Sequence, residues 1–364
     1  MAVHFGQRGP GHQARVSAAL GEEESDSTPD AFSLGDIASA PLSTLFESAT
    51  VTVQGTSAPS AVSITGGEYA VNGGAWTAVA GSVDPGDTVK VRRTSAAGVA
   101  TAVDAVLTIG GVSDTFTVTT VANAEASALA LRFTTAASDA RRGLIDACIG
   151  SLKSAGVWAK LDALYMLAAH NAQAAQRNWV QDAFNLTPVN APVFEADLGY
   201  TGVTASSAHL DTGFNDLTGS ALWSQDSMCA GAYVNAAPGL ANSFIGLTGA
   251  VSLRIGASAS SITTRIHGAS SHNVSFTNAT PGHIVVTRDT ATSSRCVRDG
   301  VQVGTTSGAA SAASSDSYVA LFRSQSSYNA DRVACAHLGG ALSVGEISNL
   351  RTAIHTYLTA LGAA

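Results

Sequence analysis

The chain is made of short runs of alternating polar and apolar residues, separated by turn-forming residues. Residues 50–53, 61–64 and 88–92 alternate, and Asn72-Gly73 and Asp84-Pro85-Gly86 lie between such runs. Alternation places apolar side chains on one face of a strand, and Asn-Gly is typical of hairpin turns. Several short strands of this kind bury a core by stacking two sheets, so the pattern predicts antiparallel β-sandwiches.

Composition excludes several classes of protein. The 364 residues are 45% hydrophobic and 13% charged, with a net charge of −8, which predicts a folded chain rather than a disordered one. No basic footprint is visible, so we expect no nucleic-acid partner. No run reaches the roughly 18 apolar residues of a membrane span. The N-terminal residues lack the apolar segment of a secretory signal, so we expect neither membrane insertion nor a signal peptide.

The patterns divide the chain into four parts. Residues 1–49 hold an acidic run (Glu22, Glu23, Glu24 and Asp26) and too few apolar residues for a core of their own. They form either a flexible tail or an arm that orders against a partner, and the spaced apolar residues favour the arm. Residues 50–121 read as a small β-sandwich, and residues 122–137 as an Ala-rich linker.

Helical and β patterns share the remaining part, residues 138–364. Ser138 is a candidate N-cap for a helix reaching Gly156, and a second helix is expected over residues 158–168. Residues 194–340 are β-like, with a hairpin turn at Asp299-Gly300. Ser343 and Glu346 match a capping box, and the apolar stripe that follows predicts a C-terminal helix packed on the β-domain or on the other helices.

The four cysteines predict no metal or redox chemistry. Cys148, Cys229, Cys296 and Cys335 are far apart in the sequence and form no CxxC motif. We expect buried free thiols, and one long-range disulfide is the alternative.

Two segments resemble known families. Residues 50–120, with GGEYAVNGGAWTAVAGSVDPGDTVKVR and LTIGGVSDTFTVTT, resemble an immunoglobulin-like (Ig-like) module of the kind that recurs in bacteriophage virion proteins and bacterial surface proteins. Residues 141–364 resemble a concanavalin A-like (laminin G-like) jelly roll. That resemblance rests on HIVVTRDTATSSRCVRDGVQVG, SYVALFRS and RVACAHLGGALSVGEISNL, and the lead-in from residue 141 is similar to the start of such domains in phage fibres.

The resemblance implies a mainly β chain. A virion-docking arm (1–49) would precede an Ig-like sandwich (50–121), a linker (122–137) and a jelly roll with a few flanking helices (138–364). It implies a fibre or spike on the head or tail of a virion, assembled in the host cytoplasm, which adsorbs to the host surface by binding polysaccharide. Virion proteins would be partners of the arm. Such fibres are commonly trimers, and the apolar helices would support an oligomer or cover the jelly roll.

Two other functions compete with the fibre interpretation. A bacterial adhesin would use the same modules, although the absent signal segment counts against it. A capsule-degrading hydrolase would need two carboxylates flanking one bond, and between residues 186 and 342 Glu195 is the sole glutamate. No GxSxG motif supports a serine hydrolase, so we expect no enzyme and no cofactor. Jelly rolls of this family sometimes bind calcium, but no dense acidic loop in this sequence predicts such a site.

Candidate saccharide contacts are aromatic and polar residues on predicted loops and strand ends. Aromatic faces pack against sugar rings, and Asp, Asn and Arg supply hydrogen bonds to hydroxyl groups. The candidates are Trp223, Tyr233, His272, Asn273, Arg323, Tyr328, Asn329 and Asp331.

Overall fold

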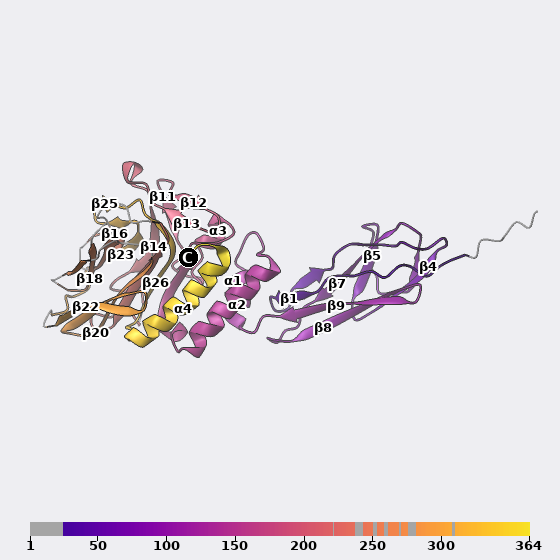
Figure 1. Ribbon diagram of the computed structural model, residues 1–364, viewed down its shortest axis with the longest axis horizontal. Helices are drawn as coiled ribbons and strands as arrows, with labels where there is room; N and C mark the ends of the chain where they lie inside the picture. Colours follow the sequence, from indigo (N-terminus) through magenta and orange to yellow (C-terminus); the bar gives the residue numbers. More distant parts are fainter. Residues whose placement is uncertain are drawn as a thin grey trace, which may run out of the picture.

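The computed structural model shows a mainly β protein with two β-sandwiches placed end to end (Figure 1), which confirms the expected fold class. It describes residues 25–220, 222–236, 243–249, 253–257, 261–268, 271–275, 282–307 and 310–364. No helix in this described part combines the length and the apolar composition that crossing a membrane requires.

The small sandwich packs a five-stranded sheet against a four-stranded one. The first has the order β1-β9-β8-β4-β6, from β1 (Ile37–Ala40), β9 (Val112–Thr120), β8 (Ala102–Ile109), β4 (Ser60–Thr65) and β6 (Gly81–Val83). The second joins β2 (Leu45–Glu47), β7 (Thr88–Thr94), β3 (Val51–Thr52) and β5 (Glu68–Val71). Alternating residues of both sheets, such as Leu107, Phe116 and Val91, are fully buried between them.

The small sandwich begins before residue 50, so the expected boundary of the N-terminal arm is wrong. β1 runs parallel to β9, and β2 pairs with β7. Leu34 and Ala40 are fully buried in the same core. The spaced apolar residues of this segment therefore complete the sandwich, and residues 1–24 of the expected arm lie outside the described residues.

Two helices join the sandwiches, α1 (Ala124–Ala130) within the expected linker and α2 (Asp139–Ser154) after it. Ser138 caps α2 as predicted. The Asp139 carboxylate accepts hydrogen bonds from the N–H groups of Ala38 (3.0 Å) and Ser39 (2.7 Å), and Arg142 Nε donates to the Ser39 carbonyl at 2.6 Å. These bonds join the first turn of α2 to the backbone of β1 and so attach the helix to the small sandwich.

The large sandwich packs an eight-stranded sheet against a seven-stranded one. The eight-stranded sheet contains β12 (Val193–Glu195), β13 (Gly199–Thr201), β26 (Arg332–Gly339), β15 (Met228–Val234), β20 (Gly282–Thr290), β21 (Ser293–Arg298) and β22 (Val301–Ser307), in that order, with β10 (Leu161–Met166) paired to β26. The seven-stranded sheet has the order β11 (Thr187–Val189), β14 (His209–Asn215), β23 (Tyr318–Leu321), β16 (Ser243–Leu247), β17 (Leu253–Ala257), β18 (Ser261–Ile266) and β19 (His272–Ser275).

The prediction of a helix over residues 158–168 is wrong. After a short 3-10 turn, η1 (Trp158–Lys160), the chain forms β10, and every residue of this strand is buried. β10 lies antiparallel to β26 and is covered on both faces, so its sequence LDALYM is apolar apart from Asp162 and does not alternate. Such a run does not distinguish a buried strand from a helix by its periodicity.

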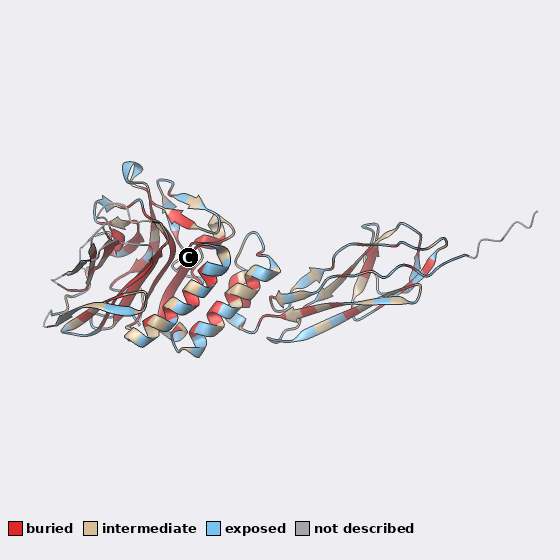
Figure 2. Cartoon of the chain, in the orientation of Figure 1, coloured by how far each residue is buried: buried red, intermediate tan, exposed pale blue. Residues whose placement is uncertain are grey.

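Other local predictions are confirmed. The capping box joins Ser343 and Glu346 at the start of α4 (Val344–Leu361), and Asp299-Gly300 turns between β21 and β22 with φ values of 49° and 82°. All four cysteines are buried and free. The buried stripe of α4 packs on both α2 and the eight-stranded sheet, so the helices cover the outer face of that sheet (Figures 1 and 2).

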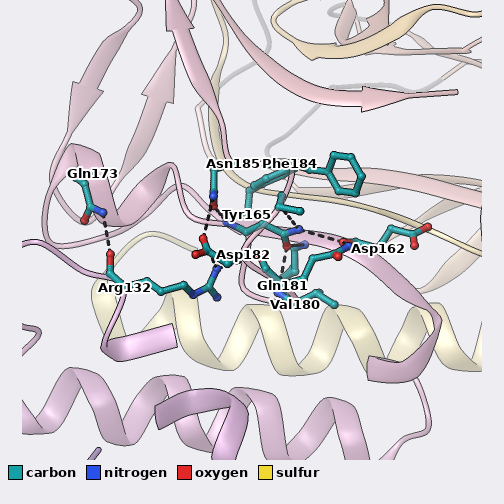
Figure 3. A network of polar contacts seen from close by, with 12 residues as sticks. Arg132, Asp162, Tyr165, Gln173, Val180, Gln181, Asp182, Phe184 and Asn185 are labelled. Carbon is teal, nitrogen blue, oxygen red and sulfur yellow. Dashed lines mark hydrogen bonds and ion pairs between the residues drawn. The ribbon is translucent and has the colours of Figure 1, made fainter. Parts of the chain in front are cut away.

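A network of polar contacts surrounds β10 (Figure 3). Gln181 Nε2 donates to the Asp162 carbonyl at 2.9 Å, and the Tyr165 hydroxyl donates to the Phe184 carbonyl at 2.7 Å. Arg132 Nη1, from the end of α1, donates to the Gln181 carbonyl at 2.9 Å. Because these bonds satisfy backbone carbonyls beside a buried strand, the network is structural.

Two neutral histidines lie buried between the eight-stranded sheet and α4. His283 of β20 and His337 of β26 are fully buried, with 3.0 Å between their Nε2 atoms. Burial and the neighbouring ring hold the pKa of His283 well below 6.5, and burial lowers that of His337 to about 3. Gly231 makes room for the pair, since a Cβ there would lie 2.3 Å from His337 Nε2.

Candidate functional site

A hairpin lies over the outer face of the seven-stranded sheet. It consists of β24 (Arg323–Ser324) and β25 (Ser327–Tyr328), directly after β23. Gly246 of β16 permits this close approach, because a Cβ there would lie 2.5 Å from the Ser324 Cβ. The N–H of Gln325 donates to the Leu247 carbonyl at 2.9 Å, which fixes the hairpin to the strand below.

β14 presents polar residues on the same outer face. Leu210, Thr212 and Phe214 are fully buried on the inner side, so His209 and Asp211 alternate to the outer side. His209 Nε2 lies 3.2 Å from Arg323 Nη1 and 3.3 Å from Asp211 Oδ1. The His209 ring lies 5.6 Å from the ring of Tyr328. Strand and hairpin therefore bring a cation, a carboxylate, an imidazole and a phenol together.

The backbone fixes the proton of His209. Its Nδ1 lies 2.8 Å from the Ser207 carbonyl oxygen, which can only accept, so Nδ1 carries the hydrogen. In the neutral ring Nε2 then accepts from Arg323 Nη1. Arg323 Nε donates to the Gln325 carbonyl at 3.0 Å. The guanidinium is thus held from two sides, which limits the entropy it loses when it binds a further acceptor.

A hollow of about 430 Å³ opens beside this cluster. It is lined by Asp211, Gly213, Thr248, Tyr318 and Arg323. Tyr318 is 50% exposed, and the Asp211 side chain is 41% exposed. An aromatic ring, a guanidinium, a carboxylate and a hydroxyl around one hollow offer a packing face with donors and acceptors, which suits a polyhydroxylated ligand.

The eight predicted contacts do not form one site. Arg323 and Tyr328 lie together in the cluster above. Asn273 lies on β19, at the other edge of the sheet, beside a separate hollow of about 360 Å³. His272 is in the same strand, and its side chain lies outside the described residues.

Four predicted contacts are buried and do not face solvent. Trp223 is 4% exposed, with its ring 5.5 Å from Phe214 in the sandwich core. Tyr233 is 4% exposed, and its hydroxyl lies 2.9 Å from His355 Nδ1 of α4. Asn329 and Asp331 are 2% exposed and bond to each other, with Asn329 Nδ2 3.0 Å from Asp331 Oδ2. Their expected place on the binding surface is wrong, because all four side chains are buried.

Sequence reasoning missed His209, Asp211 and Tyr318 as site residues. The signal was present in HLDTGFN, where alternation places His209, Asp211 and Gly213 on one face.

Asp216, the residue directly after β14, has a structural role. Asp216 Oδ1 accepts from the Ser317 N–H at 2.7 Å, and its Oδ2 accepts from the Ser315 N–H at 2.8 Å. These bonds, with His267, lower the pKa of Asp216 to about 2 despite its burial. Among the residues in the ranges given above, no three histidine, cysteine or carboxylate side chains converge as a metal site requires.

No protein-family model matches the chain, and no curated protein matches it. Solved structures resemble it at a distance. Domain 4 of AbnA, a GH43 extracellular arabinanase from Geobacillus stearothermophilus in complex with arabinotriose, is 10% identical over 53% of this chain and 98% of its own, with a TM-score of 0.37. The ligand-binding domain of botulinum neurotoxin serotype D, in complex with N-acetylneuraminic acid, is 8% identical over 56% of this chain and 52% of its own (TM-score 0.39). Trypanosoma rangeli sialidase is 12% identical over 70% of this chain and 43% of its own (TM-score 0.41). This chain thus spans about half of the toxin domain, and at these scores the similarities carry no functional argument.

Proposed function

We propose that the large sandwich is a saccharide-binding domain and that the hollow at Asp211, Tyr318 and Arg323 contacts the sugar. The supporting observation is the convergence of these three groups around one hollow of about 430 Å³. The Tyr318 ring packs against the C–H face of a sugar, Arg323 donates to its oxygens, and Asp211 accepts from its hydroxyls. No bond is made or broken in this role.

We place this binding in a virion fibre or spike that adsorbs to a host surface, assembled in the host cytoplasm and displayed in several copies. This assignment rests on the sequence resemblance of the two modules. Repeated copies convert weak single contacts into firm attachment by raising the effective concentration of sites. A bacterial surface adhesin is the second candidate, since the same hollow serves both.

Binding is tested by electrophoresis in gels that contain purified bacterial capsular or cell-wall polysaccharides. We expect Y318A and R323A each to weaken retardation about tenfold, which corresponds to roughly 1.4 kcal/mol. R295A is the matched control, because Arg295 is an ion-paired arginine of the opposite sheet, 2.6 Å from Asp289. Wild-type retardation of Y318A and R323A would refute the site, and release of reducing sugar would refute binding without turnover. Detection of the protein on purified phage particles supports the fibre, whereas detection in particle-free cell envelopes supports the adhesin.

A further inference from the structure

Trp76 lies on the outer face of the four-stranded sheet in the small sandwich. The residue after it, Thr77, exchanges two backbone hydrogen bonds of 2.9 Å with Tyr69 of β5, which places Trp76 beside that strand. The guanidinium carbon of Arg92 lies 4.7 Å from the centre of the indole ring. Arg92 is itself held by Glu68, with Nη2 2.6 Å from Oε2. The indole is therefore fixed on one face by a stacked, ion-paired arginine.

A hollow of about 330 Å³ lies against the indole. Its polar lining includes Glu47, Lys90 and Thr88, and Lys90 Nζ lies 3.1 Å from Glu47 Oε2. Gly73 and Gly74 leave one wall without side chains, and Gly73 has a φ of 71° with no atom within 4 Å of a Cβ placed there. The volume is at the small end of the range for ligand pockets, which suits one sugar ring of a chain rather than a large molecule.

The two hollows share a set of chemical groups, although they belong to different sandwiches. Each combines one aromatic ring, one carboxylate and one cation with threonine and glycine. In the large sandwich these are Tyr318, Asp211, Arg323, Thr248 and Gly213. In the small sandwich Trp76, Glu47, Lys90, Thr88 and the two glycines take the same parts. In both hollows the formal charges cancel, so neither attracts a charged ligand over a neutral one.

We propose that the Trp76 hollow is a second saccharide-binding site, and that it takes a neutral, polyhydroxylated sugar of a polysaccharide chain. The inference rests on the proposed function and extends it, because the small sandwich then binds the same class of ligand as the large one. A chain that carries two sites binds a polymer with a higher effective concentration at the second site.

The experiment uses the full-length chain in gels containing dextran, yeast mannan, arabinogalactan or debranched arabinan, with alginate as the acidic probe. The variants are W76A, R323A and the double variant, and W76F keeps a flat ring at the same position. V79A is the matched control, because Val79 is 74% exposed on the same sandwich and does not line the hollow. Melting curves establish that each variant is folded.

For any neutral polysaccharide that retards the wild type, we expect W76A and R323A each to weaken binding about tenfold, the double variant to lose both contributions, and W76F and V79A to bind nearly as the wild type does. The second site is refuted and the first stands if W76A binds like the wild type, the double variant binds like R323A, and R323A itself is impaired. If W76A is impaired and R323A is not, the second site stands and the first is refuted. Retardation by alginate alone refutes the neutral sugar, and retardation by none of the probes refutes both sites.

Discussion

Mild acid is expected to destabilise the large sandwich far more than the small one. The reason is the buried pair His283 and His337, whose pKa values lie below that of an exposed histidine, with His337 at about 3. In the unfolded chain both titrate near 6.5. Between pH 6.5 and the lowered values the unfolded state therefore binds more protons, so the free energy of unfolding falls as the pH falls.

The size of the effect follows from this linkage. From pH 7 to pH 5, one histidine that stays neutral in the folded state costs about 1.9 kcal/mol, and two cost about 4 kcal/mol. That is a large part of the roughly 5–15 kcal/mol that stabilises a typical domain. For a domain of this size it corresponds to a fall in Tm of about 8–16 °C.

The chain contains its own control for this measurement. The small sandwich, residues 25–121, contains no histidine, so its unfolding transition does not respond to histidine titration. Differential scanning calorimetry at pH 7, 6 and 5 should show one transition that moves with pH and one that barely moves. H337Q should reduce the pH dependence to about 2 kcal/mol, because one titrating group remains. The reasoning is refuted if both transitions move equally, or if H337Q retains the full dependence.

Four further outcomes follow from single contacts. D216A should cost about 3 kcal/mol in urea unfolding because it leaves buried N–H groups without an acceptor, and in the wild type the stability from this lowered pKa should be lost only as the pH falls from about 3.8 towards 2. G246A should displace the hairpin at a cost of about 1–3 kcal/mol, whereas G345A, which meets no atom within 4 Å in α4, should be neutral or stabilising; equal costs would contradict the close approach. The four buried cysteines should react with a thiol reagent only after denaturation, and a fast reaction in the native protein would contradict their burial. D139A should loosen the joint between the sandwiches, seen as a wider distribution of distances in X-ray scattering, and an unchanged distribution would show that Arg142 suffices.

Local signals in the sequence predicted the elements that depend on local physics. The capping box of Ser343 and Glu346, the cap at Ser138 and the turn at Asp299-Gly300 are formed by residues within a few positions of one another. Alternation likewise predicted two-sheet packing, because it reports which strand face meets a core.

The elements that were missed depend on contacts distant in sequence. β10 pairs with β26, more than a hundred residues away, and lies between the sandwich core and the helices, so its largely apolar sequence does not alternate. The burial of Trp223 and Tyr233 is not evident from the sequence, because a ring with one polar atom suits a surface as well as a core, and His355, the partner of the Tyr233 hydroxyl, lies far along the chain. The cluster of His209 with Arg323 depends on a hairpin that follows β14 by more than a hundred residues, and only the fold brings the two together.

The parallel pairing of β1 with β9 affects how the protein responds to mechanical force. β1 and β9 are parallel, with Ile37 opposite Val118 and Ala40 opposite Thr120. Tension between residue 25 and the large sandwich therefore pulls the two strands along their length in opposite directions, so their hydrogen bonds are sheared together rather than unzipped one by one. The bonds from Asp139 and Arg142 carry part of the same tension directly from β1 into α2. A protein that holds a surface against flow would resist detachment along this axis better than across it.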